Sequence, residues 1–203
     1  MNNLFSLSGK VAVVTGGSRG IGAMIAKGFV DAGVRTYISA RKLDLDSVAA
    51  DIQAMGQKAL TVTTDVLDFE QLQRLADSAM AEFGRIDILV NNAGATWGEP
   101  IDDFSEKGWD RVMDLNTKTI FFLSQKLLPQ LRAAGDATDP SRIINIASVN
   151  GITNPGMENY SYSASKAAVI QLTRHMASRL VTDNILVNGI APGFFPSKMT
   201  AFM

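Results

Sequence analysis

The stretch "YSYSASK", from Tyr160 to Lys166, holds the residue pair of this chain that is best suited to acid–base chemistry. Tyr162 and Lys166 are four residues apart, which places them on one face of a helix, whereas Tyr160 is six residues from the lysine and lies off that face. A tyrosine has a pKa of about 10, and a nearby ammonium lowers that pKa by favouring the phenolate. The pair predicts that Tyr162 exchanges a proton with a carbonyl or alcohol oxygen, and leaves Tyr160 to frame the substrate entrance.

Two further polar residues are expected beside this pair. Ser148 ends the apolar stretch "INIAS", where its hydroxyl could hydrogen-bond a substrate carbonyl, although serine at a strand end is also typical of a cap or turn. Asn116 lies inside the helix-like stretch "MDLNTKT", and asparagine competes for the backbone hydrogen bonds of a helix. We interpret Asn116 as a local kink that holds a water beside Lys166; an exposed or capping asparagine is the alternative.

A glycine-rich stretch, "TGGSRGIG" from Thr15 to Gly22, is predicted to bind the pyrophosphate of a dinucleotide. Backbone N–H groups at a helix N-terminus bind phosphate when no side chain blocks the approach. The spacing G-x-x-x-G-x-G differs from G-x-G-x-x-G and lacks the Gly-Lys-Ser/Thr ending of a P-loop, so a glycine turn without a ligand is the alternative. The candidate cofactor contacts in this stretch are Gly16, Ser18, Arg19, Gly20, Ile21 and Gly22.

The end of the next apolar stretch, "ISARK", bears on the choice of cofactor. An acidic residue at this place holds the ribose 2′-hydroxyl of NAD, whereas arginine suits the 2′-phosphate of NADP. Here Ala40 takes the acidic position, Arg41 follows it, and Arg19 is expected nearby. Two guanidinium groups can bind a dianion through charge-assisted hydrogen bonds, so we predict NADP(H). Two alternatives remain. Arg41 could be a solvated surface charge, and the cofactor could be NAD(H), because the acidic residues Asp44 and Asp46 follow shortly after the strand.

The ends of two later apolar stretches supply the next predicted cofactor contacts. Asp65 could accept a hydrogen bond from the adenine amino group. The stretch "NNAG", from Asn91 to Gly94, is expected to form the wall beside the cofactor, and asparagine there also suits a turn. The candidate contacts in these places are Asp65, Val66, Asn92, Ala93 and Gly94.

These residues need a scaffold that brings distant segments to one edge. Short β-branched stretches alternate with helix-like ones, and the short stretches are apolar on both faces, as in a parallel sheet covered by helices. This pattern predicts one domain, residues 1–203, with a doubly wound α/β fold whose strand carboxyl ends bind the ligand. The predicted strands are 10–17, 35–40, 59–65, 86–94, 142–148 and 185–193, and the predicted helices are 21–33, 45–56, 69–84, 105–134 and 160–180.

The composition narrows the function classes. Of 203 residues, 46% are hydrophobic and 19% charged, and the net charge is -1, which disfavours nucleic acid and anionic membranes as partners. The chain has no cysteine and a single histidine, His175, which we expect to be a surface or packing residue, so we predict no metal site. The first residues lack a signal-peptide core and no apolar run approaches the ~20 residues of a membrane span, so we predict a cytoplasmic protein.

The combined motifs resemble the short-chain dehydrogenase/reductase family over essentially the whole chain. The resemblance rests on "TGGSRGIG", "NNAG" and the four residues Asn116, Ser148, Tyr162 and Lys166. It implies a Rossmann-like sheet, a nicotinamide cofactor and a catalytic tetrad formed by these four residues, with Lys166 also holding the nicotinamide ribose. It further implies cofactor contacts in "PGFFPSKMT": Pro192 and Gly193 beside the nicotinamide, and Ser197, in place of the usual threonine, near its carboxamide.

More narrowly, "FSLSGKVAVVTGGSRGIG" and "NNAGATWG" are similar to NADPH-dependent 3-oxoacyl-[acyl-carrier-protein] reductases, those of rhamnolipid synthesis among them. This implies that a ketone is reduced, most simply a 3-oxoacyl thioester that can be carried on acyl carrier protein. The resemblance also implies a homodimer or homotetramer formed through the two long helices. The alternatives are an NAD-linked alcohol dehydrogenase of another substrate class, an epimerase, and a nucleotide-binding sensor or scaffold without turnover.

One departure from the family concerns the C-terminal part of the sheet. Family members continue for several tens of residues past the position of Met203 and add a substrate-covering helix and a seventh strand. We therefore expect this chain to lack the final strand and the lid helix. The sheet would then end in an exposed edge strand, which favours aggregation unless it is covered.

Overall fold

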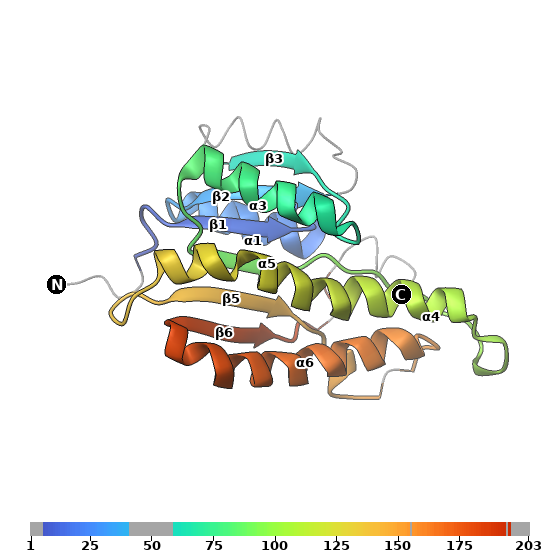
Figure 1. Ribbon diagram of the computed structural model, residues 1–203. Helices are drawn as coiled ribbons and strands as arrows, with labels where there is room; N and C mark the ends of the chain where they lie inside the picture. Colours follow the sequence, from blue (N-terminus) through green and yellow to red (C-terminus); the bar gives the residue numbers. More distant parts are fainter. Residues whose placement is uncertain (1–5, 41–58, 155, 194, 196–203) are drawn as a thin grey trace.

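The core of the protein is a parallel sheet of six strands in the order β3-β2-β1-β4-β5-β6 (Figure 1). The computed structural model describes residues 6–40, 59–154, 156–193 and 195. All six predicted strands are present, so the doubly wound α/β fold is confirmed. The strands are β1 Val11–Thr15, β2 Arg35–Ala40, β3 Ala59–Thr63, β4 Ile88–Asn91, β5 Ser141–Ile146 and β6 Ile185–Ile190.

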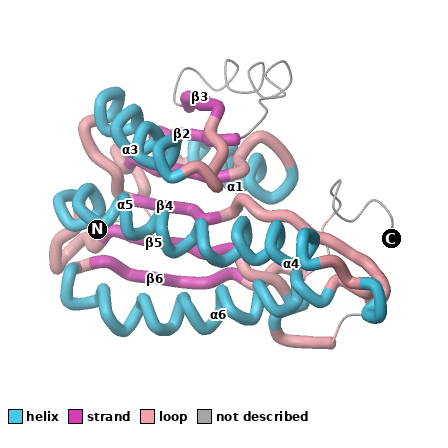
Figure 2. Tube along the Cα trace, turned by 45° about the vertical axis from the view of Figure 1, so that its right-hand side comes forward, coloured by secondary structure: helices cyan, strands magenta, loops and turns pink. Residues whose placement is uncertain are grey.

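Helices cover both faces of the sheet. Figure 2 shows α3, α5 and α6 on one face and α1 on the other. The helices are α1 Gly20–Asp31, α3 Phe69–Phe83, α4 Glu106–Met113, α5 Thr119–Ala134 and α6 Tyr160–Leu180. Short 3-10 turns, Ile101–Asp103, Val149–Gly151 and Val181–Asp183, flank α4, α6 and β6. The helix predicted over residues 45–56 lies outside the described residues.

The local sequence explains where α3 begins and ends. The Asp68 side chain accepts hydrogen bonds from the backbone N–H groups of Glu70 and Gln71, which caps the helix N-terminus. Gly84 follows the last turn with φ 73°, a left-handed conformation that glycine adopts without strain. Between these ends, Leu72 and Leu75 are fully buried in the main core against the sheet. The helix predicted over residues 69–84 is therefore confirmed, and these buried leucines position it on the sheet.

Strand β6 departs from the predicted pattern of two buried faces. Ile185 and Val187 are buried on the side that α6 covers, but the alternate residues Leu186 and Ile190 are 38% and 49% exposed. β6 is the last strand of the sheet order, as expected for an exposed edge, and the described part of the chain holds no strand beyond it. A strand at such an edge alternates between buried and exposed positions because only one face has a neighbour.

The described helices include no segment that is both long and apolar enough to span a bilayer.

Candidate active site

The long predicted helix, residues 105–134, is interrupted at the point that Asn116 marks. Helices α4 and α5 are joined by a π-helical turn, Asp114–Lys118, and the backbone N–H of Thr119 bonds to the Asp114 carbonyl across it. The Thr119 hydroxyl donates to the same carbonyl at 3.1 Å. Single π turns inside α-helices are frequent at functional sites. The predicted kink is confirmed, and the alternative of an exposed asparagine is wrong because Asn116 is fully buried.

The Asn116 side chain is committed to the protein itself. Its Nδ2 donates to the Ala95 carbonyl at 2.9 Å and to Ser165 Oγ at 3.0 Å, and its Oδ1 accepts from the Ala95 N–H at 2.9 Å. A Cβ placed on Gly94 would lie 3.2 Å from Asn116 Oδ1 and 3.7 Å from Lys166 Nζ. Asn116 and Lys166 thus both lie beside Gly94. A water between them could only donate a hydrogen bond to Asn116 Oδ1, because both hydrogens of Asn116 Nδ2 already have acceptors.

Tyr162 and Lys166 lie on the first turns of α6, on one helix face as their spacing predicts. Lys166 Nζ is 5.6 Å from the centre of the Tyr162 ring and donates to the Ile146 carbonyl at 2.7 Å. Lys166 is 4% exposed, and this burial lowers the pKa of its ammonium to about 8. The lysine is therefore a desolvated cation held between the end of β5 and the tyrosine ring.

The predicted lowering of the Tyr162 pKa by Lys166 is wrong for this structure. Burial raises the pKa of the Tyr162 phenol above its usual value, and a side-chain hydrogen bond with Ser148 works in the opposite direction. Desolvation is the larger effect because the charged phenolate loses more hydration than the neutral phenol. The phenol is therefore held in its protonated form.

Ser148 is brought to Tyr162 by the turn that follows β5. It is buried, and its Oγ accepts from the Asn150 N–H at 3.2 Å, so it also caps the short helix Val149–Gly151. The cap interpretation of this serine is therefore confirmed, and its hydrogen bond to a substrate carbonyl stays a prediction. The N–H of Val149 bonds to the Pro192 carbonyl at 3.0 Å, which ties this turn to the segment after β6.

The glycine stretch forms a tight turn between β1 and α1. Gly16 and Gly20 have φ values of 64° and 54°, a conformation that side chains disfavour. A Cβ on Gly22 would lie 2.3 Å from the Gly16 carbonyl oxygen and 2.4 Å from Asn92 Nδ2, so only glycine fits there. The α1 N-terminus has no side-chain cap and no acidic residue in its first turn. Its N–H groups are available to an anion, which fits the predicted pyrophosphate site.

Thr15 and Asn92 join the glycine turn to the end of β4. Asn92 Nδ2 donates to the carbonyls of Thr15 and Gly16 at 3.0 and 3.1 Å. Thr15 Oγ1 accepts from the backbone N–H groups of Asn92 and Ala93 at 3.0 and 3.1 Å. These bonds bring the predicted cofactor residues Gly16, Asn92, Ala93 and Gly94 to one edge of the sheet.

The remaining predicted contacts occupy different places. Asp65 is half-buried after β3, and its Oδ1 accepts from the Leu67 N–H at 3.1 Å. The Val66 carbonyl accepts from Thr119 Oγ1 at 3.2 Å, which links this loop to the start of α5. Ser18 and Ile21 are half-buried in the glycine turn, Arg19 and Gly193 are exposed, and Pro192 is half-buried. Arg41 and Ser197 lie outside the described residues.

Asn91 does not belong to the cofactor wall. It is buried, and its Nδ2 donates to Asn145 Oδ1 at 2.8 Å and to Ser124 Oγ at 3.2 Å. Asn145 Nδ2 in turn donates to Thr173 Oγ1 at 3.0 Å. Asn91 instead joins β4 and β5 to α5 and α6. For the three residues from Asn92 onward, the place beside the cofactor stays a prediction.

Sequence reasoning missed Thr15 and Ser165 as site residues. Thr15 opens the glycine stretch, and its partners lie after β4, so their contacts follow only from the neighbouring positions of β1 and β4 in the sheet. Ser165 directly precedes Lys166 and bonds Asn116 from 49 residues away. The available signal was its place three residues after Tyr162, which puts it near the same helix face.

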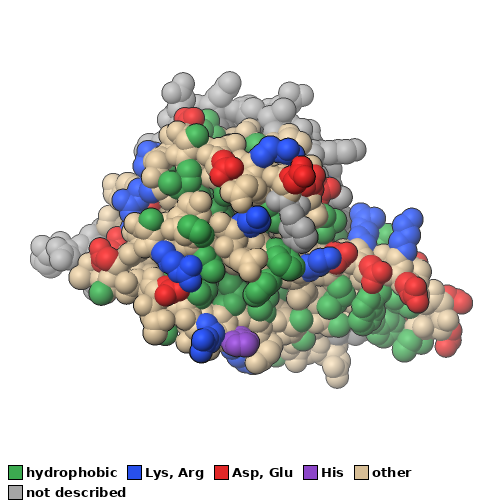
Figure 3. Space-filling model, viewed as in Figure 1, with side chains coloured by type: hydrophobic (Ala, Val, Ile, Leu, Met, Phe, Trp, Pro, Cys, Tyr) green, Lys and Arg blue, Asp and Glu red, His purple; other side chains and the backbone are tan. Residues whose placement is uncertain are grey.

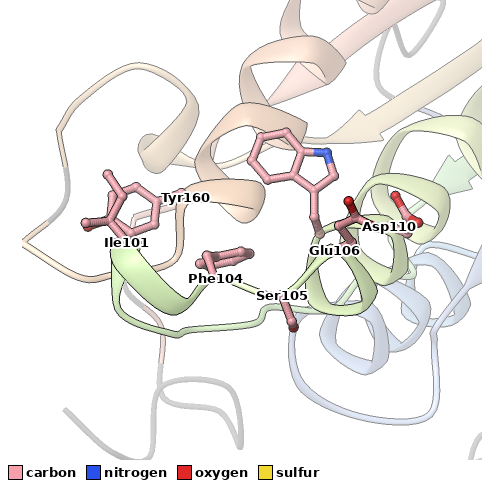
Figure 4. Close-up of a pocket in the computed structure, with 7 residues that line it drawn as sticks. Ile101, Phe104, Ser105, Glu106, Asp110 and Tyr160 are labelled. Atoms are coloured by element: carbon pink, nitrogen blue, oxygen red, sulfur yellow. The ribbon is translucent and has the colours of Figure 1, made fainter.

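A cavity of about 590 Å³, here called the outer cavity, lies beside the α6 N-terminus, where Tyr160 lines it (Figure 4). Tyr160 and Phe104 meet edge to face at 5.8 Å, and Phe104 meets Trp109 in the same way at 6.3 Å. Ile101 closes the apolar side and Glu106 stands on the other. The Tyr160 ring thus packs in this cavity against Phe104, and its place at the substrate entrance stays a prediction.

Other kinds of site find no support in the described residues. No group of three or more histidine, cysteine, aspartate or glutamate side chains is placed to bind a metal ion there. His175 is exposed on α6, in agreement with its predicted role as a surface residue.

Comparison with known proteins places this arrangement in a family. The model of the short chain dehydrogenase family matches residues 10–203. This chain is a short-chain dehydrogenase. The dehydrogenase is therefore an NAD(P)-dependent oxidoreductase that acts on CH–OH or C=O groups, which confirms the family and the enzyme class inferred from the motifs.

Two curated relatives of the dehydrogenase show the range of substrates in similar sequences. It is 45% identical over 201 residues to the rhamnolipids biosynthesis 3-oxoacyl-[acyl-carrier-protein] reductase of Pseudomonas aeruginosa, covering 98% of this chain and 78% of that protein. It is 42% identical over 196 residues to the 2-dehydro-3-deoxy-D-gluconate 5-dehydrogenase of Escherichia coli, covering 97% and 76%. The narrower predicted resemblance to rhamnolipid-pathway reductases is confirmed.

Solved structures agree with the fold of the dehydrogenase. The complex described as Pseudomonas aeruginosa RhlG/NADP active-site complex superposes with a TM-score of 0.93 at 45% identity, covering 100% of this chain and 79% of that chain. A short-chain type dehydrogenase/reductase from Mycobacterium marinum superposes with a TM-score of 0.91 at 34% identity, covering 98% and 78%.

Proposed function

We propose that this dehydrogenase reduces the ketone of a 3-oxoacyl thioester with NADPH as the cofactor. The observation that carries the proposal is the convergence of Ser148, Tyr162 and Lys166 at the edge of the sheet that also holds the glycine turn. A protonated phenol beside a cation, with a second hydroxyl in reach, suits the donation of a proton to a carbonyl oxygen.

In this proposal each residue acts on the ketone oxygen or on its neighbour. Ser148 donates a hydrogen bond to the ketone oxygen and polarises the carbonyl. Tyr162 gives its hydroxyl proton to the same oxygen as negative charge develops there. Lys166, desolvated and held by the Ile146 carbonyl, places a positive charge near the tyrosine ring and stabilises the phenolate that remains. Asn116 accepts a hydrogen bond from the water that returns the proton.

The residues of the cofactor edge fit a dinucleotide. A Cβ on Gly22 or Gly16 would meet neighbouring atoms within 3 Å, so the turn is closely packed at these two positions. The N-terminus of the helix that follows has no side-chain cap. Backbone N–H groups of the turn would hold the pyrophosphate, Lys166 the nicotinamide ribose, and Arg19 with Arg41 the 2′-phosphate. NADPH supplies the hydride when it is bound. NADP in the solved relative supports this choice over NAD.

The charge of the segments beside the tetrad favours an uncharged ketone. We call residues 94–105 and 147–165 the substrate-side segments. They include Gly94, which lies beside Asn116 and Lys166, and the tetrad residues Ser148 and Tyr162. They contain no lysine, arginine or histidine, and their charged residues are acidic. A substrate carboxylate would find no cation within these segments and would meet like charge there. Arg111, outside them, lies over the Trp97 ring, with its Cζ 5.5 Å from the ring centre. A neutral thioester therefore suits these segments better than a sugar acid.

The substrate proposal is tested by comparing the reduction rates of a 3-oxoacyl thioester and of a keto sugar acid, the two substrate classes that the names of the relatives indicate. We expect the N-acetylcysteamine thioester of a 3-oxo acid to give a kcat/KM at least about a hundredfold above that of 5-ketogluconate, both with NADPH, because an unpaired charge costs several kcal/mol. Loss of NADPH absorbance at saturating cofactor measures both rates. A preference for the sugar acid would refute the substrate class, and no turnover of any ketone would refute the reductase itself.

The cofactor proposal is tested at Arg41. We expect Arg41→Ala to weaken NADPH binding by about tenfold to a hundredfold, the loss of a charge-assisted hydrogen bond, and to change NADH binding less than about twofold. Arg174→Ala, an exposed arginine of α6, is the matched control and should change neither. Fluorescence titration with both cofactors measures the affinities. Equal weakening of NADPH and NADH would contradict the phosphate assignment.

A second candidate function has one specific observation in its favour. The 42% identity to a 2-dehydro-3-deoxy-D-gluconate 5-dehydrogenase supports a dehydrogenase of a sugar acid. The same experiment decides between the two candidates. A sensor or scaffold without turnover is disfavoured because the described site retains all four residues of the tetrad: Ser148 hydrogen-bonds Tyr162, Lys166 lies beside the Tyr162 ring, and Asn116 and Lys166 both lie beside Gly94.

The proposal includes a homodimer or homotetramer that works in the cytoplasm, with an acyl group carried on acyl carrier protein. Hydrophobic side chains gather on the face of α5 and toward the end of α4, with acidic side chains beyond them (Figure 3). Phe121 of α5 and Trp109 of α4 are 43% and 41% exposed. An exposed apolar face of this kind supports self-association.

A further inference from the structure

We propose that Ser165 is a positioning residue of this site, which fixes Asn116 and, through it, the loop that follows β4. The kinetic part of this inference rests on the proposed function, whereas the structural part concerns contacts that exist with any substrate. Ser165 is fully buried on α6, between Tyr162 and Lys166.

The Ser165 hydroxyl makes two hydrogen bonds with a fixed direction. Its Oγ donates to the Tyr162 carbonyl at 2.7 Å and accepts from Asn116 Nδ2 at 3.0 Å. A hydroxyl has one hydrogen, so its donor is committed to the helix and its lone pair is left for the asparagine. Ser165 therefore holds the Nδ2 end of the Asn116 amide from the side of α6.

The same amide holds the loop after β4. Its second Nδ2 hydrogen goes to the Ala95 carbonyl, and its Oδ1 accepts from the Ala95 N–H, each at 2.9 Å. Gly94, the residue before, faces Asn116 Oδ1 and Lys166 Nζ. A chain of hydrogen bonds thus runs from Ala95 through Asn116 and Ser165 to Tyr162 and joins the loop, the π turn and the first turn of α6.

Removing the hydroxyl breaks this chain at its centre. In Ser165→Ala a buried Nδ2 hydrogen of Asn116 is left without an acceptor, and this unpaired donor is unfavourable. We expect the amide to shift toward another acceptor and its two bonds with Ala95 to weaken. The loop beside Lys166 is then held less firmly, although Tyr162, Ser148 and Lys166 are unchanged.

The test uses two readouts and a matched control. We expect Ser165→Ala to lower kcat about tenfold or more, the effect of misplacing reacting groups, and to speed hydrogen exchange at the Ala95 amide. Ser178→Ala removes an equivalent bond of α6, from Ser178 Oγ to the His175 carbonyl at 2.8 Å, at an exposed position far along the helix. This control should leave both readouts as in the wild type.

A double-mutant cycle separates positioning from a general loss of stability. If Ser165 acts through Asn116, Ser165→Ala should cost little further kcat in an Asn116→Ala background, whereas an independent structural effect adds in full. Additive losses, or unchanged Ala95 exchange, would overturn the proposal. Ser165→Cys, close in size and a weak donor, replaces the alanine variant if that does not fold. Hydrogen exchange needs no substrate, so this result stands apart from failure of the proposed activity.

Discussion

Tyr162→Phe should lower kcat for ketone reduction by at least about a thousandfold, within the range for loss of a general acid. The ring stays in place, so packing and cofactor binding are retained, while the one proton donor beside Lys166 is gone. The raised pKa of this phenol means that the hydroxyl carries its proton at neutral pH, which is the form that reduction consumes. Single-turnover oxidation of bound NADPH and a separate NADPH titration measure chemistry and binding independently.

Tyr160→Phe is the matched control for this experiment. Tyr160 begins the same helix, but its ring meets Phe104 in the outer cavity and its hydroxyl has no place in the proposed proton transfer. We expect kcat within about twofold of the wild type, since a substitution away from the reacting atoms has little effect. If both variants lose activity equally, or if Tyr162→Phe keeps its rate, Tyr162 is not the acid.

The fold was predictable because its signals are local. The apolar strands and the α3 cap at Asp68 follow from neighbouring residues, and so does the one-face pairing of Tyr162 with Lys166. The exposed face of β6 was not predictable in this way. Leu186 is a leucine like the buried Leu89 of β4. It is exposed because, within the described residues, nothing covers the face of β6 on which it lies.

The pKa shifts of the site residues could not be predicted, because they depend on burial, and the spacing of residues in the sequence does not show burial. A lysine four residues from a tyrosine suggests a lowered phenol pKa, but enclosure of both groups reverses the direction for Tyr162 and lowers the pKa of Lys166. The kink at Asn116, by contrast, could be predicted from its residue type, because asparagine competes for the backbone hydrogen bonds of a helix. Its partners Ala95 and Ser165 are 21 and 49 residues away, and only the packing of α6 against the π turn brings them together.

The second large effect is expected at Gly22 of the glycine turn. In Gly22→Ala the new Cβ would lie 2.3 Å from the Gly16 carbonyl oxygen and 2.4 Å from Asn92 Nδ2. Neither atom can move freely, because Asn92 Nδ2 is bonded to the carbonyls of both Thr15 and Gly16. We expect a loss of about 3 kcal/mol in the free energy of unfolding, typical of an overpacked site, and at least about tenfold weaker NADPH binding.

Gly28→Ala, on the same helix α1, separates the close approach from the general effect of adding a methyl group. A Cβ on Gly28 meets nothing within 4 Å, and Gly28 is exposed. Alanine there should raise the free energy of unfolding by about 0.5–1 kcal/mol, because glycine is a poor helix former, and leave NADPH binding unchanged. Urea unfolding and NADPH titration of both variants measure these effects. Wild-type binding and stability in Gly22→Ala would show that the β1–α1 turn opens without cost, and that its close contact with Asn92 does not shape the cofactor site.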